Sequence, residues 1–247
     1  MNTPASGEHR AGIASGESRA GVASGEGRSG VASGDRRPIA ARQTGWAQRV
    51  AAWLVARRAS ANGISLAGMA AAALAGLCFW GVWHAAPGGF AQRLLWLLGA
   101  ALVQARLLAN LFDGMVALGR GIASPVGELY NEVPDRVSDT AILLGLGAAA
   151  GGLWRLGLAA SLAAMATAYI RAVGKAAGAG SDFSGPMAKQ QRMALATGVA
   201  VVSALLPLRW QFPGGWHLAA WVLGAITLLA ALTAVRRLVR VAGVLRR

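Results

Sequence analysis

The chain has 247 residues, of which 55% are hydrophobic and only 14% are charged. Soluble domains carry about a quarter charged residues, so this composition excludes an ordinary soluble protein and favours one with several membrane-spanning segments. The net charge of +14 comes mainly from arginines at the ends of apolar runs, a placement that suits anionic lipid headgroups better than nucleic acid. The single cysteine, Cys78, excludes an intrachain disulfide.

Residues 5–37 repeat with a nine-residue period. Each copy begins Ala-Ser-Gly and continues with an acidic residue and a basic one nearby. Such a unit buries too little apolar surface to offset the entropy of ordering it, and it is shorter than the repeats of about 20–50 residues that build solenoids. We therefore expect residues 1–40 to form a disordered tail.

The segment 44–58 has the pattern of an amphipathic helix. Trp46, Val50, Trp53 and Leu54 recur at helical spacing, and arginines flank or oppose them. This pattern is typical of a helix that lies in the membrane interface with its tryptophans at headgroup depth. A helix packed on the protein's own membrane domain would give the same pattern, and the two interpretations are compatible.

Six apolar segments follow, each reaching the 20 or so residues that cross a hydrocarbon core. They cover roughly 63–84, 91–117, 125–150, 153–175, 188–207 and 217–238. The sequence predicts an all-α polytopic membrane protein, with six transmembrane helices in one bundle and an N-terminal interfacial amphipathic helix. Residues 44–240 would form this membrane domain, and residues 241–247 a basic C-terminal tail.

Basic residues predict the orientation of the bundle. Arginines gather before the first segment and after the last, and the loop around 175–192 contains Lys175, Lys189 and Arg192. The alternate loops carry one arginine each, Arg93, Arg155 and Arg209. The positive-inside rule then places both termini on the cytoplasmic side of the cell (inner) membrane. His84 and His217 would lie near the outer side without evident partners, and six tryptophans near segment ends would form an aromatic belt (Trp80, Trp83, Trp96, Trp210, Trp216 and Trp221).

Of the ten acidic residues, five fall between Asp113 and Asp139, on the side predicted to be cytoplasmic. An ionised group at bilayer depth costs roughly 2.5–3.5 kcal/mol on insertion scales, so a chain this poor in carboxylates is expected to use them. Helical spacing places two polar stripes on facing segments: Arg106, Asn110, Asp113 and Ala117 on one, and Glu128, Asn131, Asp135 and Asp139 on the other. Their oxygens suit a hard divalent cation such as Mg²⁺ or Mn²⁺.

This stretch resembles the signature of the CDP-alcohol phosphotransferase (phosphatidyltransferase) family, D-x2-D-G-x2-A-R-x8-G-x3-D-x3-D. Asp113-Gly114, Ala117, Gly127 and Asp135 match at the correct offsets. Asn110 and Asn131 stand at the first and third Asp positions, and Leu118 stands where the family has Arg. The resemblance covers roughly residues 44–240.

The resemblance implies a homodimeric membrane enzyme that transfers a phosphatidyl or phosphoalcohol group from a CDP-linked lipid to an alcohol and releases CMP. It implies a two-metal Mg²⁺ or Mn²⁺ site with the ligands Asn110, Asp113, Asn131 and Asp135, and Asp135 as the catalytic base. It also implies a set of substrate-binding residues: Gly114, Ala117, Ser124, Gly127, Arg171 and Lys189. Nucleic acid is not an expected partner.

The departures from the signature leave alternatives open. Asn at two Asp positions lowers the site's formal charge by two, so the chain could be a weakened relative that binds nucleotide or lipid without turnover. Glu128 or Asp139 could restore a carboxylate, and Arg120 could replace the missing Arg. The acids could instead form a structural polar network between helices. A small transporter is a further alternative, although the six segments contain no internal repeat of the kind transporters often show.

Overall fold

The computed structural model describes residues 40–121 and 125–246; the surroundings of side chains are described from Arg42 to Gly121 and from Glu132 onward. Within these residues the chain is helical and contains no β-strand. The α-helices are α1 (Gly45–Ala56), α2 (Ala61–His84), α3 (Phe90–Gly119), α4 (Pro125–Ala149), α5 (Trp154–Ala176), α6 (Lys189–Leu205) and α7 (Leu218–Leu245). Three short 3₁₀-helices accompany them, η2 (Ala40–Gln43), η3 (Leu208–Trp210) and η4 (Pro213–Gly215). The predicted tail, 1–40, lies almost wholly outside the described residues.

The all-α fold is confirmed, and each predicted apolar segment coincides with one of the helices α2 to α7. Four of these, α2, α3, α5 and α7, are long and apolar enough to cross a membrane, which is fewer than the six predicted. The other two helices, α4 and α6, do not meet this criterion, for separate reasons. Helix α6 has only 17 residues, and the first half of α4 carries most of the acidic cluster, which lowers its hydropathy.

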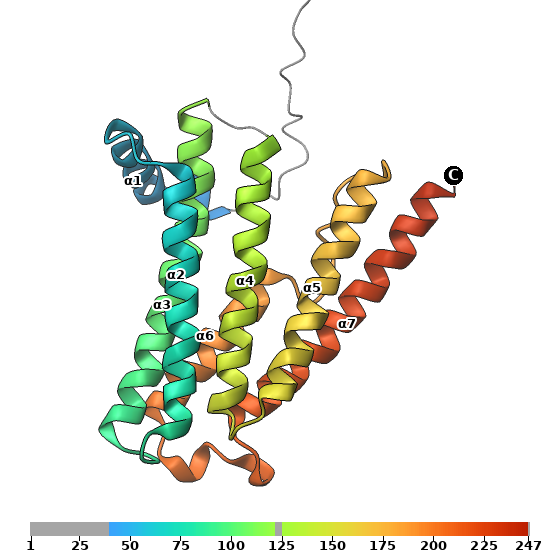
Figure 1. Cartoon of the computed structure of the whole chain (residues 1–247). Helices are drawn as coiled ribbons and strands as arrows, with labels where there is room; N and C mark the ends of the chain where they lie inside the picture. The colour runs from blue at the N-terminus through green and yellow to red at the C-terminus, as the bar shows by residue number, and fades with distance from the viewer. Residues whose placement is uncertain (1–39, 122–124, 247) are drawn as a thin grey trace, which may run out of the picture. The chain divides into compact units, whose positions relative to one another are not determined.

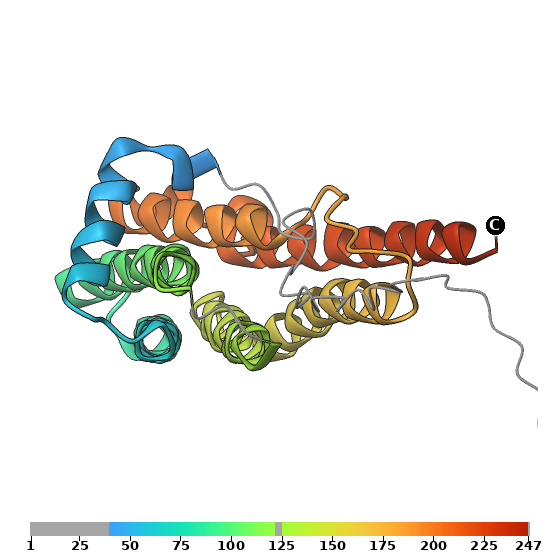
Figure 2. The same ribbon diagram turned by 90° about the horizontal axis from the view of Figure 1, so that it is seen from above.

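The helices pack in a fixed order of neighbours. Helix α2 packs against both α3 and α4, α5 packs against α4 and α7, and α6 packs against α3 and α7. In Figure 1, α2, α3 and α4 run beside one another while α5 and α7 lean away from α2. Helix α1 packs on α3 and is seen lengthwise in Figure 2, in which α2 is seen end-on. This arrangement brings the C-terminal part of α3 and the N-terminal half of α4 together.

Glycines let α2, α4 and α5 approach closely. A Cβ atom on Gly76 of α2 would meet the backbone of Ala141, and one on Gly145 of α4 would meet the backbone of Gly76. Gly157 of α5 faces the backbone of Leu143 in the same way. Small residues at such crossings allow backbones to touch, which is how membrane helices gain packing energy without a hydrophobic driving force between them.

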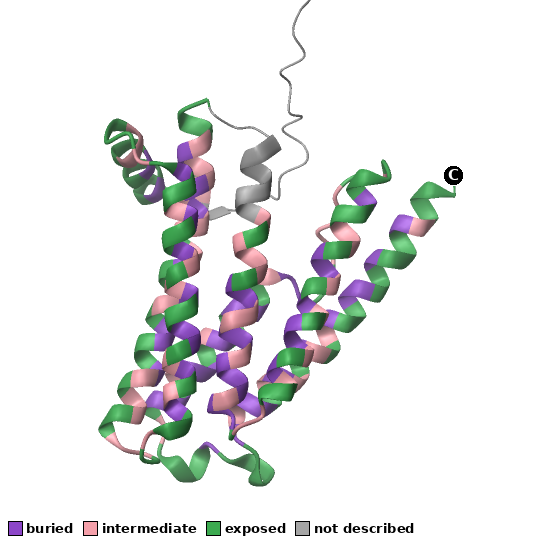
Figure 3. Cartoon of the chain, viewed as in Figure 1, coloured by how far each residue is buried: buried purple, intermediate pink, exposed green. Residues whose placement is uncertain are grey.

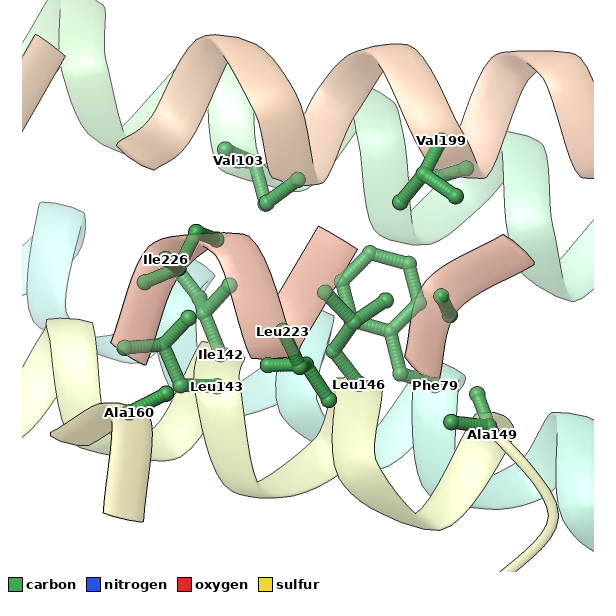
Figure 4. Packing of buried hydrophobic residues seen from close by; sticks show 14 of the residues in the cluster. Phe79, Val103, Ile142, Leu143, Leu146, Ala149, Ala160, Val199, Leu223 and Ile226 are labelled. Carbon is green, nitrogen blue, oxygen red and sulfur yellow. The ribbon is translucent and has the colours of Figure 1, made fainter. Parts of the chain in front are cut away.

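The core lies between the helices, and the outer faces are apolar as well. Phe79, Leu143, Leu146, Leu223 and Ile226 are fully or almost fully buried and meet in the middle of the bundle (Figure 4). Many other large apolar side chains are exposed, and Figure 3 shows that exposed residues run along the helices from end to end. Monomeric soluble proteins rarely expose such continuous apolar surface, whereas lipid would cover it.

Several predictions about the ends of the segments were wrong. Trp96 was expected in an aromatic belt, but it is buried and stacks on His217 with ring centroids 5.4 Å apart. His84 and His217 were expected to have no partners. His84 Nε2, however, accepts a hydrogen bond of 2.9 Å from Trp80 Nε1, and His217 Nδ1 accepts one from the backbone N–H of Ala219 and so caps α7. Helix α7 also continues beyond residue 238 to Leu245, through most of the predicted basic tail. Sequence spacing alone does not distinguish an inward-facing tryptophan from an interfacial one.

Candidate functional site

One pocket, here called the polar pocket, lies where α2, α3 and α4 meet. It is lined by Ser65, Gly68, Met69, Arg106, Asn110, Asp113, Pro134, Asp135 and Ser138. Both predicted stripes contribute to it: Asn110 and Asp113 lie on one face of α3 because they are three residues apart, and Asp135 lies on α4. Pro134 is accommodated inside α4 without ending the helix. The two carboxylates that match the family signature therefore share one pocket.

The carboxylate of Asp113 is buried and is held by α2. Ser65 Oγ donates a hydrogen bond of 2.7 Å to Asp113 Oδ2 and also lies 3.2 Å from the carbonyl oxygen of Ala61. Sequence reasoning missed Ser65. The sequence shows only a hydroxyl within an apolar segment. Such a serine does not indicate a site, because its hydroxyl can hydrogen-bond to a backbone carbonyl of the preceding helical turn.

The carboxylate of Asp135 is the centre of the polar pocket's hydrogen bonds. Its Oδ1 accepts from Asn110 Nδ2 at 2.9 Å and from Arg106 Nη2 at 3.1 Å. Its Oδ2 lies 2.5 Å from Lys189 Nζ, which also donates to Asn110 Oδ1 at 2.9 Å. Three predicted site residues from three helices, Asn110, Asp135 and Lys189, are thus in direct contact.

Asp139 lies one turn deeper in α4 and is already paired. Its two oxygens each accept a hydrogen bond of 2.9 Å, Oδ1 from Arg106 and Oδ2 from Arg192. Both arginine side chains are 1% exposed, and Asp139 is 4% exposed. Arg106 is thus a partner of both Asp135 and Asp139. Asp139, however, does not line the polar pocket, so it does not replace a missing carboxylate there.

Arg171, which the resemblance implies as a substrate-binding residue, is not among the lining residues of the polar pocket. Its Nη2 is 2.6 Å from Glu132 Oε1, and its guanidinium lies over the ring of Phe183, 5.3 Å from the centroid. Arg136 also pairs with Glu132, at 3.1 Å. Glu132, one turn before Asp135, thus links α4 to α5 through Arg171 and also pairs with Arg136 of its own helix.

The remaining predicted residues lie around the pocket or outside the described part. Gly114 is approached by Arg42 of η2, whose Nη2 would be 3.0 Å from a Cβ atom placed there. Ala117 is half-buried one turn further along α3 and does not line the polar pocket. Arg120 donates to the carbonyl oxygen of Ala59 at 2.9 Å, in the connection before α2. Ser124 lies outside the described residues, and so do the surroundings of Gly127, Glu128 and Asn131 in α4.

The donor set of the polar pocket fits a hard divalent cation. Asp113 and Asp135 supply carboxylate oxygens and Asn110 an amide oxygen, the types that Mg²⁺ and Mn²⁺ prefer. Among the described side chains, no three from Asp, Glu, His and Cys gather where they could hold a metal. One reason for this is Asn110, which stands at an Asp position of the signature and supplies an amide oxygen without a negative charge.

No protein-family model matches the sequence, and no curated protein matches it significantly. Solved structures do match its fold. The phosphatidylinositol phosphate synthase of Mycobacterium tuberculosis (PgsA1) with CDP-DAG bound superposes with a TM-score of 0.62 and 21% identity, covering 79% of this chain and 92% of that one. The same synthase in complex with manganese and citrate gives 0.64 and 22% over 79% and 88%, and its apo form 0.61 and 21% over 78% and 95%.

This synthase is a member of the CDP-alcohol phosphotransferase family, the family that residues 110–135 resemble. Sequence and structure therefore agree: the chain has the fold of a CDP-alcohol phosphotransferase.

Proposed function

We propose that this protein is a metal-dependent membrane transferase that moves a phosphatidyl or phosphoalcohol group from a CDP-linked lipid to an alcohol and releases CMP. The observation that carries the proposal is the polar pocket itself, in which Asp113 of α3 and Asp135 of α4 face a common space beside Asn110. The fold supports it, because a synthase with this fold has been solved with CDP-DAG and with manganese.

The residues have distinct roles in this proposal. Asp113, Asp135 and Asn110, together with Asn131, would hold Mg²⁺ or Mn²⁺, which when bound neutralises the donor's diphosphate and stabilises the leaving group. Asp135 accepts the proton of the acceptor alcohol as general base. Its Oδ2 is the oxygen nearer to Lys189 Nζ, at 2.5 Å, and lies 3.9 Å from Arg136 Nη2.

In the reaction, the alcohol oxygen forms a bond to the lipid-linked phosphorus, and the bond from that phosphorus to the CMP oxygen breaks. Arg171 and Lys189, which contact Glu132 and Asp135 of α4, supply positive charge for substrate phosphates. Gly114, Ala117, Ser124 and Gly127 would line the path of the nucleotide, where small residues leave room for its approach.

The proposal includes a placement in the membrane. Helix α3 has 30 residues and is about 45 Å long, longer than a hydrocarbon core of about 30 Å. Asp113 lies near its C-terminal end and so at the membrane surface, with α1 in the interface beside it. We expect α2 to α7 to provide six crossings, both termini and the polar pocket to face the cytoplasm, and the protein to form a homodimer.

The experiment is an assay of CMP release by the full chain in lipid vesicles, with labelled CDP-diacylglycerol, Mn²⁺ and a panel of polyols and phosphorylated polyols. The proposal expects Mn²⁺-dependent CMP release with at least one acceptor. Asp135→Asn should abolish it, and Asp113→Ala, which removes a proposed metal ligand, should raise the Mn²⁺ concentration needed for release or abolish release. Arg155→Gln, at the start of α5 and predicted on the opposite side, serves as the control and should retain activity. Ion flux through the vesicles without CMP release would instead support a transporter.

A second candidate, a relative that binds the CDP-linked lipid without turnover, is favoured by one observation. The Lys189 ammonium already pairs with the proposed base at 2.5 Å. This candidate predicts saturable binding of CDP-diacylglycerol with no CMP release by the wild type. Release gained on changing both Asn110 and Asn131 to Asp would establish it, and release by the wild type would exclude it.

A further inference from the structure

Lys189 occupies a position among the oxygen atoms proposed as metal ligands. It is the first residue of α6 and follows the connection that contains Gly185-Pro186. Its ammonium contacts Asp135 Oδ2 at 2.5 Å and Asn110 Oδ1 at 2.9 Å. The Lys189 side chain is only 19% exposed, so its ammonium contacts protein atoms more than solvent. A cation therefore already lies between α3 and α4.

Among the described side chains, the carboxylates of Asp135 and Asp139 are already matched by cations without a metal ion. Asp135 contacts Arg106 and Lys189 and lies 3.9 Å from Arg136, and Asp139 contacts Arg106 and Arg192. Two divalent ions would add four positive charges to these matched carboxylates. An uncompensated charge in a buried site is strongly unfavourable, so a full pair of ions does not suit these residues.

Asn110 is matched to the ammonium rather than to a second metal ion. Its amide oxygen accepts from Lys189 while its amide nitrogen donates to Asp135 Oδ1 at 2.9 Å. An aspartate at this position could accept from Lys189 but would place a second carboxylate against Asp135 without donating to it. Asparagine at position 110 therefore contacts both Lys189 and Asp135 favourably, whereas an aspartate there would suit only Lys189.

We propose that Lys189 is a built-in cation of the polar pocket, in the place of one divalent ion. Its ammonium bridges Asn110 and Asp135, and the site holds a single Mg²⁺ or Mn²⁺ on the side of Asp113. This inference rests on the proposed use of a divalent ion. Lys189 then supplies one of the positive charges that would otherwise come from a bound ion.

The test counts bound Mn²⁺ in the full chain in lipid nanodiscs, from the electron paramagnetic resonance signal of the free ion, with the metal alone as probe. We expect one bound ion per chain in the wild type. The double variant Asn110→Asp with Lys189→Gln restores a carboxylate and removes the ammonium, and it should bind two. Lys175→Gln, at the exposed end of α5, removes the same charge elsewhere and should still bind one.

Two bound ions in the wild type would overturn the inference. So would a double variant that melts like the wild type and yet binds one ion or none. Release of CMP by the same samples keeps this test separate from the proposed function. Activity with two ions per wild-type chain contradicts only the role of Lys189, whereas one bound ion without activity contradicts only the transferase.

Discussion

Arg106 Nη2 lies 2.9 Å from Asp139 Oδ1, and this buried pair ties α3 to α4 directly beneath the polar pocket. The same guanidinium nitrogen lies 3.1 Å from Asp135 Oδ1. Arg192 of α6 binds the other oxygen of Asp139, so three helices converge on one carboxylate. The proposed base is therefore positioned by an arginine that is itself held by Asp139.

Asp139→Asn should strongly destabilise the protein, because it removes the carboxylate that pairs with the buried guanidinium of Arg192 and leaves Arg106 paired with Asp135. Breaking a buried ion pair by removing one partner costs about 3–5 kcal/mol. Thermal unfolding in detergent measures the loss. Glu132→Gln is the matched control: Glu132 is 40% exposed, and each of its two ion pairs, with Arg136 and Arg171, should contribute no more than about 1 kcal/mol. Equal losses in the two variants would contradict the assigned role of Asp139.

Ser65→Ala should weaken the site without disturbing the fold. It removes the hydrogen bond of 2.7 Å that orients Asp113. Loss of a partner that orients a metal ligand typically lowers metal affinity or activity by about 10–100-fold. The measurement is the Mn²⁺ concentration that gives half-maximal CMP release. Ser161→Ala, which removes a buried hydroxyl bonded only within α5, should leave that concentration unchanged; a similar shift in both variants would argue against Ser65.

Gly76→Ala should destabilise the contact between α2 and α4. Its new methyl group would meet the backbone of Ala141, which has no flexible atom to move aside. Inserting a methyl group into a packed core typically costs about 1–3 kcal/mol. Gly224→Ala in α7 is the control, because no atom lies within 4 Å of the added Cβ. Gly224→Ala should be neutral or stabilising. Differential scanning fluorimetry measures the melting temperature of both variants, and a Gly76→Ala protein that melts like Gly224→Ala would contradict the prediction.

His217, in the connection before α7, predicts a dependence of stability on pH. Burial lowers its pKa from 6.5 to about 4. Between pH 6.5 and about 4, His217 is protonated in the unfolded chain but not in the folded one. The free energy of unfolding therefore falls as pH falls from about 6.5 towards 4. The melting temperature should drop across this range in the wild type. His217→Asn keeps a capping oxygen for α7 and should flatten the dependence; an unchanged slope would show that other groups cause it.

The positions of the helices could be predicted from the sequence with little error. Apolar runs end at turn residues such as Pro87 and Gly151, and helices α2 to α7 end within a few residues of the predicted limits, except for the longer C-terminal end of α7. The common face of Arg106, Asn110 and Asp113 on α3 followed equally from helical spacing, because residues three and four apart lie on one side of a helix.

The contacts that complete the site could not be predicted in this way. Lys189 reaches Asp135 from 54 positions further along the chain, as their residue numbers give. That contact depends on how α6 packs on α3, which no local pattern specifies. The same holds for Ser65 and for the stacking of His217 on Trp96. Residues whose partners lie on another helix need the packed structure to reveal them.

The most direct test of the central claim is CMP release from labelled CDP-diacylglycerol by the full chain in vesicles, measured as Mn²⁺ is added and then chelated. The account predicts release that rises with Mn²⁺, stops on chelation and is absent in Asp135→Asn. Release that is unaffected by chelation, or equal in Asp135→Asn and the wild type, would contradict it.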